Sequence, residues 1–502
     1  MAIRESNFTP AIALLAVLAI PAQAVGAQPW DSHFNSDAAA ILNAAAQIQV
    51  ASDQPVDILL EDYRYDIGPS GRLKETYRKV YRILHQEAIE GWSAAERQYQ
   101  PWRDSKPVLR ARVITSDGAV HDLDPKTIAD APAADADDSV FSDARIVRAP
   151  LPAVAAGAII EYEITVDSAP SFPEAGFSGL ASVFDTVPIE RFHVALDAPK
   201  GTALKVAGRM IADSAIQRTS SKGATHIELD LGPLKARKDF ESYLPFNAPN
   251  WPGLAFTTAQ SWQILSERYS AIVDAQIQAA DLKPLMPNVD PAAAPEVIVA
   301  QLTSRLHRNI RYTGVEFGDA AIVPARPGEV MQRKYGDCKD KSTLLVAMLR
   351  SAGLKASVAL LDSGYGTDTD PEIPGVDRFN HAIVYVDLPG KPMWIDATAS
   401  QYRVGALPSA DQGRQALIAS KGTTGLVTIP EHNDEWERET YEIRFKDFGP
   451  ASITQIMEAN GPYEATLRGS YVANSNVHDS LEKFVKPDLC TQRASRAVAP
   501  FG

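Results

Sequence analysis

One stretch of the sequence places a cysteine where a nucleophile would work. The segment KYGDCKDKSTLLVAMLRSAGLKA, residues 334–356, contains Cys338, one of two cysteines in 502 residues. The apolar residues that follow recur at helical spacing, and Gly353 marks the predicted end of the helix. Cys338 then lies in the first turn, with Asp337 or Gly336 as the cap. Free backbone N–H groups and the helix dipole favour a reactive thiolate there, so Cys338 is a candidate nucleophile.

A nucleophilic cysteine needs a base, and the base needs a group that orients it. The stretch FNHAIVYVDLPGKPMWIDAT predicts two strands joined by a turn. If the turn is centred between Leu388 and Pro389, His381 lies directly opposite Asp396, and opposed residues of an antiparallel pair share a face. Asp396 would then hold the imidazole tautomer while His381 accepts the thiol proton.

Each of these residues also has an ordinary structural explanation. A single cysteine is often inert or bridged, a strand histidine is often structural, and an aspartate near a turn is often a cap. Cys338 and Cys490 would form a disulfide if the protein enters an oxidising compartment. The order of Cys338, then His381 on one strand, then Asp396 on the next is more specific than its parts and favours catalysis.

The first residues predict export. Arg4 precedes the ten-residue apolar run from Ala11 to Ile20, which is followed by Pro21 and by small residues that suit a signal peptidase. The run is shorter than the ~20 apolar residues that cross a bilayer. We therefore expect a signal peptide over residues 1–27 and a periplasmic or secreted protein with no transmembrane span after its removal. Glu5 weakens the positive end and leaves an uncleaved anchor or a buried segment as alternatives.

Charge and motifs exclude several classes of function. The formal net charge is −14 and no concentrated basic patch is present, which argues against nucleic acid as a partner. The sequence contains no phosphate loop, no nucleotide fingerprint and no Cys/His spacing typical of a zinc site. No cofactor and no metal are expected.

The pattern of apolar residues changes twice along the chain. Short β-rich runs fill residues 56–231 and predict a β-sandwich-like domain. Helical spacing begins after Thr257 or Thr258 as a possible cap, and Pro295 opens a second helix. The β pattern returns from Glu437. We expect a multidomain α+β protein with a β domain over 28–245, a helix-and-strand domain over 246–425 and a partial C-terminal β region over 426–502.

Three motifs together resemble a known family. The run QRKYGDCKDKSTLL is nearly RRYGDCKDKxxLL, and FNHAIVYV with WIDAT completes the pattern. The chain resembles bacterial exported proteins of the transglutaminase-like superfamily that carry an N-terminal DUF3857 domain, which VITSDGAVHDLDP and the run FSDARIVRAPLPAVAAGAIIEYE resemble. The core resemblance covers residues 256–402. It implies a papain-like transglutaminase core with Cys338 as nucleophile, His381 as base and Asp396 as the orienting group.

Residues near the cysteine have less specific predictions. An oxyanion hole needs donors aimed at the tetrahedral intermediate, and the backbone N–H of Cys338 would be one. Tyr312 is a possible second donor or cleft residue, by loose analogy with the aromatic donor of transglutaminases, although a packed structural tyrosine is the alternative. Glu316 fits a structural role equally well. Asp337, Lys339 and Asp340 are interpreted first as helix-end charges and second as substrate contacts.

The loop DSGYGTDTDPEIPGVDR, residues 362–378, carries five acids and one arginine. We expect a solvated acidic loop. The alternative is a rim of the cleft that attracts cationic groups such as a lysine amine.

The function expected from these observations is thiol-dependent acyl transfer from amide bonds of proteins or peptides. Hydrolysis is favoured over crosslinking because an exported protein meets water freely, although both share one acyl-enzyme. The alternative is a non-catalytic binding or assembly module of the cell envelope that uses a papain-like core for recognition.

Overall fold

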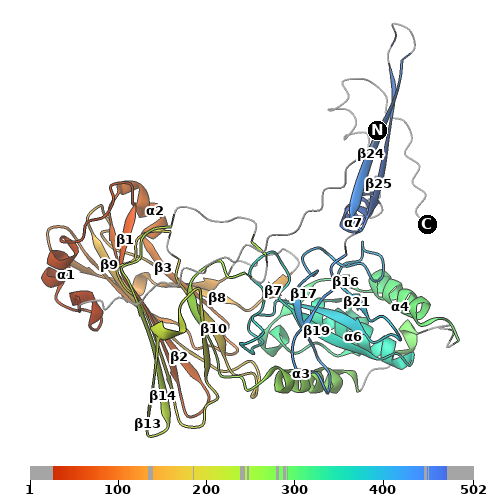
Figure 1. Ribbon diagram of the computed structural model, residues 1–502, viewed down its shortest axis with the longest axis horizontal. Coiled ribbons are helices and arrows are strands. Elements are labelled where there is room, and N and C mark those ends of the chain that lie inside the picture. Colours follow the sequence, from red (N-terminus) through yellow and green to blue (C-terminus); the bar gives the residue numbers. More distant parts are fainter. Residues whose placement is uncertain are drawn as a thin grey trace, which may run out of the picture.

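The structure of the protein is a computed structural model (Figure 1). It describes residues 27–471 apart from positions 134–139, 185, 238–243, 246–247, 279–281, 287–289, 291, 433, 446–448 and 450. The predicted signal peptide lies outside these residues except for its last position, and Cys490 lies outside them as well. Within the described part of the chain, no helix is long and apolar enough to span a membrane.

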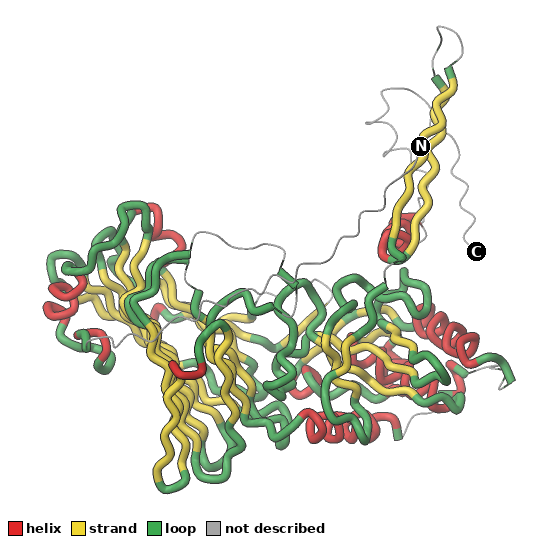
Figure 2. Tube along the Cα trace, viewed as in Figure 1, coloured by secondary structure: helices red, strands yellow, loops and turns green. Residues whose placement is uncertain are grey.

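An eight-stranded sheet dominates the N-terminal part of the molecule (Figure 2). Its strand order is β13-β14-β11-β1-β2-β9-β4-β5, and each neighbouring pair is antiparallel except β1 with β11. The strands are β1 (Val56–Ile67), β2 (Leu73–Ile83), β4 (Val108–Ile114), β5 (Val120–Asp122), β9 (Ile159–Ser168), β11 (Phe192–Ala198), β13 (Ile216–Ser221) and β14 (Ala224–Leu231).

Two three-stranded sheets complete the N-terminal core, in the orders β3-β8-β6 and β10-β15-β12. Buried apolar side chains of all three sheets form one cluster, which confirms the predicted sandwich-like packing. The last strand, β15, follows the predicted domain boundary at residue 245 and still pairs with β10 and β12. The strands are β3 (Ala94–Tyr99), β6 (Ala129–Pro132), β8 (Arg145–Pro150), β10 (Ser178–Ser182), β12 (Lys205–Arg209) and β15 (Gly253–Thr257).

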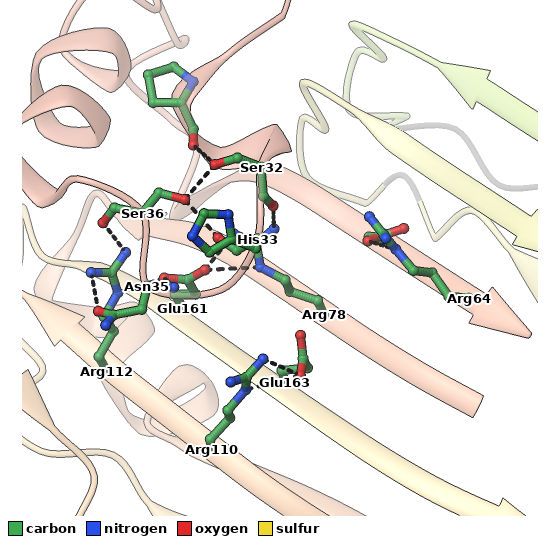
Figure 3. Close-up of polar contacts among 12 residues, drawn as sticks. Ser32, His33, Asn35, Ser36, Arg64, Arg78, Arg110, Arg112, Glu161 and Glu163 are labelled. Atoms are coloured by element: carbon green, nitrogen blue, oxygen red, sulfur yellow. Dashed lines mark hydrogen bonds and ion pairs between the residues drawn. The ribbon is translucent and has the colours of Figure 1, made fainter. Parts of the chain in front are cut away.

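The opposite face of the large sheet is covered by α1 (Ala38–Ala45) and by the segment before it. Beneath that segment, Arg78 of β2 and Arg112 of β4 meet Glu161 of β9, and all three side chains are buried (Figure 3). Arg112 Nε donates to Glu161 Oε2 at 2.6 Å and Arg78 Nε donates to Oε1 at 2.9 Å. Arg78 Nη1 and both Nη groups of Arg112 donate to oxygens of residues 32–36. One buried carboxylate therefore holds two arginines that fix the N-terminal segment on the sheet.

The second part of the molecule wraps one helix, α6, in a sheet and three other helices (Figure 1). The sheet has the antiparallel order β21-β20-β19-β22-β23. Every residue from Lys339 to Leu349 in α6 is buried. The elements are α3 (Trp262–Ile277), α4 (Pro295–Asn309), α5 (Pro327–Arg333), α6 (Cys338–Ser351), β19 (Ala356–Leu361), β20 (His381–Val386), β21 (Met393–Ile395), β22 (Gln415–Ile418) and β23 (Val427–Thr428).

Two predicted helix starts have different outcomes. The helix α4 begins at Pro295, as predicted. The predicted cap at Thr257 or Thr258 is wrong, because α3 begins at Trp262 and the Oγ of Ser261 accepts a hydrogen bond from Ile264 N at 3.2 Å. Thr257 instead ends β15, which continues the sheet of the N-terminal part.

Short elements connect the two parts and extend the chain beyond them. The strands β7 (Val140–Ser142) and β17 (Gly314–Glu316) pair in parallel across the junction. A hairpin follows the core and projects from the body (Figure 1). The remaining elements are α2 (Ile89–Trp92), β16 (Arg311–Tyr312), β18 (Tyr335–Gly336), β24 (Trp436–Arg444), β25 (Ser452–Asn460) and α7 (Pro462–Tyr471).

Replacing Glu161 by Gln removes the charge that both buried arginines share, and the guanidinium groups then lose their ionic partner. We expect the free energy of unfolding of the N-terminal part to fall by about 3–5 kcal/mol, measured by urea denaturation. The matched control is Glu163→Gln, because Arg110 pairs with Glu163 at 2.7 Å and is largely exposed. This control is expected to cost at most about 1 kcal/mol. Equal losses in both variants would contradict the account.

Candidate active site

The first turn of α6 presents Cys338 as predicted. Asp337 caps the helix, since its Oδ1 accepts a hydrogen bond from Asp340 N at 2.9 Å. In return, the Asp340 carboxylate accepts a hydrogen bond from Asp337 N at 3.4 Å. Gly336 permits this close turn, because a Cβ at that position would lie 2.7 Å from the Cβ of Asp340. Cys338 is the first residue of α6, and its half-buried thiol forms no disulfide among the described residues. The N–H groups of Cys338 and Lys339 therefore lie in the same turn as the sulfur.

The predicted register of the hairpin is wrong by two residues. Val384 pairs with Ile395 and Val386 with Met393, which places Asp396 opposite position 383 instead of opposite His381. The turn is centred one residue later in the chain than predicted. The two-residue shift keeps Asp396 on the same face as His381, because side chains of a strand alternate with a period of two. The two side chains therefore still meet, along a diagonal.

His381 lies between a carboxylate and the thiol. Its Nε2 is 3.4 Å from Asp396 Oδ2, and the ring also contacts Cys338. Burial disfavours the charged ring, but the charge of Asp396 and the polar contacts with Asp396 and Cys338 outweigh it and raise the pKa of His381 well above its ordinary value. The geometry therefore favours an imidazolium beside the sulfur.

Asp396 is stabilised as a negatively charged carboxylate, which complements a positive charge on His381. Burial alone would raise its pKa, but the charge of His381 and hydrogen bonds from Thr398 lower the pKa of Asp396 below its ordinary value. The N–H and the hydroxyl of Thr398 both donate to Asp396 Oδ1 at 2.7 Å. One oxygen is thereby fixed by the chain, and the other faces the histidine.

A cavity of about 270 Å³ opens at the sulfur and the imidazole. Both halves of the molecule line it, since Phe172 comes from the N-terminal part. Tyr312 is not among the described residues that line this cavity. Its strand β16 pairs with β18, so the backbone of Tyr312 lies opposite Gly336, beside the loop that carries the cysteine. The lining residues are Phe172, Tyr269, Glu316, Ala321, Ile322, Cys338, Lys339, Leu360, Val376, Phe379, Asn380, His381 and Ala382.

The charges beside the cysteine form a buried network, which the sequence could not place. Lys339 is 5% exposed and forms ion pairs with Asp337 and, at 3.1 Å, with Glu316. Burial disfavours the charged lysine, but Asp337, the thiol and Glu316 raise the pKa of Lys339. The expectation of helix-end charges is met for the cap residue Asp337. Glu316 and Lys339 additionally line the cavity.

The loop of residues 362–378 is exposed in part, at Tyr365 and Glu372 among others, but it is not a free acidic rim. Asp377 accepts a hydrogen bond from Arg103 Nη1 at 2.9 Å, and Asp370 forms an ion pair with Arg209. Both arginines belong to the N-terminal part. Most of its acids are thus committed to ion pairs and backbone contacts that join the two halves. The expectation of a solvated loop is therefore met only in part, and attraction of cationic substrates by this loop has no support.

One half-buried base, His307, and one buried base, Lys341, lie behind the site and were missed from the sequence. His307 Nε2 donates to Ala397 O at 3.1 Å, and Lys341 Nζ donates to Ile310 O at 3.1 Å. Burial and the charge of Lys341 lower the pKa of His307 to about 4, so its ring is neutral. Burial lowers the pKa of Lys341 to about 8, although Asp396 opposes this. His307 thereby supports the backbone directly after Asp396.

Two family models match the chain. Residues 69–238 match the domain of unknown function DUF3857, and residues 287–399 match the transglutaminase-like superfamily. The chain joins a DUF3857 domain to a transglutaminase-like core. No curated protein matches its sequence.

One solved structure shares the fold at low sequence identity. A "putative protease" from Parabacteroides distasonis is 16% identical, with a TM-score of 0.57 over 75% of this chain and 72% of that one. An M1 zinc metallopeptidase from Deinococcus radiodurans covers 41% of this chain at 12% identity and a TM-score of 0.21. A "putative cysteine protease" from Cytophaga hutchinsonii covers 78% at 11% identity and a TM-score of 0.16. The first of these shows a shared multidomain fold with a papain-like core.

Stability of the transglutaminase-like core should depend on His307 at acidic pH. The unfolded ring binds a proton near its ordinary pKa of 6.5, whereas the folded ring does so at about 4, so stability is lost as pH falls through this window. Between pH 7 and pH 5, His307 should lower the free energy of unfolding by about 2 kcal/mol, measured by urea denaturation. From pH 7 to pH 5, the free energy of unfolding of His307→Gln should fall by about 2 kcal/mol less than that of the wild type. Identical losses in the wild type and the variant would contradict a neutral buried ring.

Proposed function

We propose that the protein is an exported thiol enzyme that transfers the acyl group of peptide or protein amides to water. Cys338 is the nucleophile, His381 the base and Asp396 the orienting group. The observation that carries this proposal is the contact of His381 with both the Asp396 carboxylate and the thiol at the first turn of a buried helix. This constellation suits nucleophilic catalysis because each group supports the reactive state of the next.

The chemistry requires two displacement steps. With the proton of Cys338 held on His381, the sulfur adds to the amide carbon to form a tetrahedral intermediate. The backbone N–H of Cys338 and its neighbours in the first turn of α6 are positioned for the developing oxyanion. The C–N bond breaks as His381 gives its proton to the leaving amine. Water then attacks the thioester, His381 takes a proton from it, and the carboxylic acid leaves with return of the thiol.

The lining of the cavity supports an apolar group next to the scissile bond. Phe172, Val376 and Phe379 face a space of about 270 Å³ beside the sulfur, which suits one large side chain. The similar chain from Parabacteroides distasonis carries the name of a protease, in agreement with a peptide substrate. An N-terminal apolar run supports export, and we propose a periplasmic or secreted protein that acts on proteins or peptides of the cell envelope.

Single substitutions test the proposed roles. With fluorogenic peptide amides that carry apolar residues before the amide, Cys338→Ala should abolish turnover and His381→Ala should reduce it by at least about a hundredfold. The matched control is His193→Ala, because His193 also pairs with a carboxylate, Asp62, at 2.7 Å, but lies in the DUF3857 domain. It should leave turnover within about twofold of the wild type, since it touches no reacting group.

Mass spectrometry of the quenched reaction should show one acyl group on Cys338, and an added alkylamine should divert little of it from water. A dominant alkylamide product would instead show crosslinking chemistry. Turnover that survives Cys338→Ala, or no adduct with any peptide in the panel, would contradict the enzyme proposal. It would favour a binding or assembly module.

A further inference from the structure

A third buried group, Asp411, joins the pair of His381 and Asp396. It lies in the chain between β21 and β22, and the fold brings it to the same end of the sheet. A ring nitrogen of His381 and one carboxylate oxygen each of Asp396 and Asp411 all lie within 4.8 Å of one another. Asp396 is 6% exposed and Asp411 is 1% exposed. Two carboxylates thus share a site with one imidazole.

Asp411 lacks a partner for half of its carboxylate. Its Oδ1 accepts a hydrogen bond from the hydroxyl of Ser363 at 2.6 Å. Its Oδ2 is buried and has no hydrogen-bond partner among the described residues. A buried acceptor left unsatisfied costs about 1–3 kcal/mol, and more when it is charged. A positive partner at this oxygen would remove that cost.

The spacing of the donors is that of ligands around a cation. A direct charge-assisted N–H···O contact is about 2.7–2.9 Å long. The Nε2 of His381 and Oδ2 of Asp396 are farther apart, at 3.4 Å. In a tetrahedral zinc site with bonds of about 2.0–2.1 Å, neighbouring donor atoms lie about 3.4 Å apart. The pair therefore already has the separation of two zinc ligands, and a small movement of Asp411 would complete three.

We propose that His381, Asp396 and Asp411 bind a divalent transition-metal ion, best matched by Zn²⁺, with water as the fourth ligand. An imidazole nitrogen suits zinc, whereas Mg²⁺ and Ca²⁺ prefer oxygen ligands alone. Cys338 does not belong to this cluster, so the thiol is not a ligand. The site differs in this respect from a metal held between a catalytic thiol and its histidine.

The ion would act as a reversible inhibitor, and this consequence rests on the proposed function. Zinc replaces the proton on Nε2, so Asp396 binds the metal and no longer orients the ring. The histidine then cannot pass protons between the thiol and the leaving amine. The bound ion would stabilise the folded core and switch off acyl transfer until it is removed.

Calorimetric titration with ZnCl₂ after removal of metal by a chelator tests the site. Wild type and Cys338→Ala should each bind one ion with affinities within about twofold, while Asp411→Asn should bind more than about tenfold more weakly. The matched control is Asp57→Asn, another buried acid with an unpartnered oxygen that lies in β1 of the N-terminal part, and it should bind zinc like the wild type. Mg²⁺ and Ca²⁺ should give no binding heat.

Loss of binding in Cys338→Ala, with binding intact in Asp411→Asn, would overturn the proposal in favour of a thiol–imidazole site. No binding in the wild type would also overturn the proposal. A water molecule or a proton would then satisfy the buried Oδ2 of Asp411. If Asp411→Asn does not fold, Co²⁺ absorption of the wild type decides, since a thiolate-to-metal band would place Cys338 on the ion. Because Cys338→Ala is inactive under the proposed function, its binding is measured independently of catalysis.

Discussion

The whole site depends on the burial of α6. A helix enclosed by a sheet and three other helices needs a cap from within the protein at its N-terminus. Asp337 caps it, Lys339 neutralises the cap, and Glu316 balances the lysine. The sulfur of Cys338 lies next to these charges in the same turn. The same constraint that stabilises the helix therefore fixes the electrostatic environment of the sulfur.

The second contributor is the junction between the DUF3857 domain and the core. The loop of residues 362–378, which leads to His381, is anchored to the N-terminal part by the ion pair of Arg103 with Asp377. Phe172 of the same N-terminal part enters the cavity wall. The DUF3857 domain thus holds the approach to the histidine and shapes the space beside the sulfur, so its role in the site is direct.

Local features were predictable from the sequence, and long-range ones were not. The capped helix at Cys338 follows from residues within one turn. The register of His381 against Asp396 depends instead on the position of a turn, and the observed turn is centred one residue later than predicted. The face was still predicted correctly because a two-residue shift preserves alternation. Asp411 and Phe172 have no local signal at all, because only the folded sheet and the domain junction bring them to the site.

Alkylation of the folded protein tests the central claim that His381 activates the sulfur of Cys338. The rate of iodoacetamide labelling at Cys338 is measured by mass spectrometry from pH 4 to 9 in the wild type and in His381→Ala. The account predicts fast labelling that persists at pH 5 to 6, well below the free-thiol value of about 8.5, and that slows in the variant at these pH values. Equal pH profiles in the two proteins, both falling off below pH 8 as for an ordinary thiol, would contradict it.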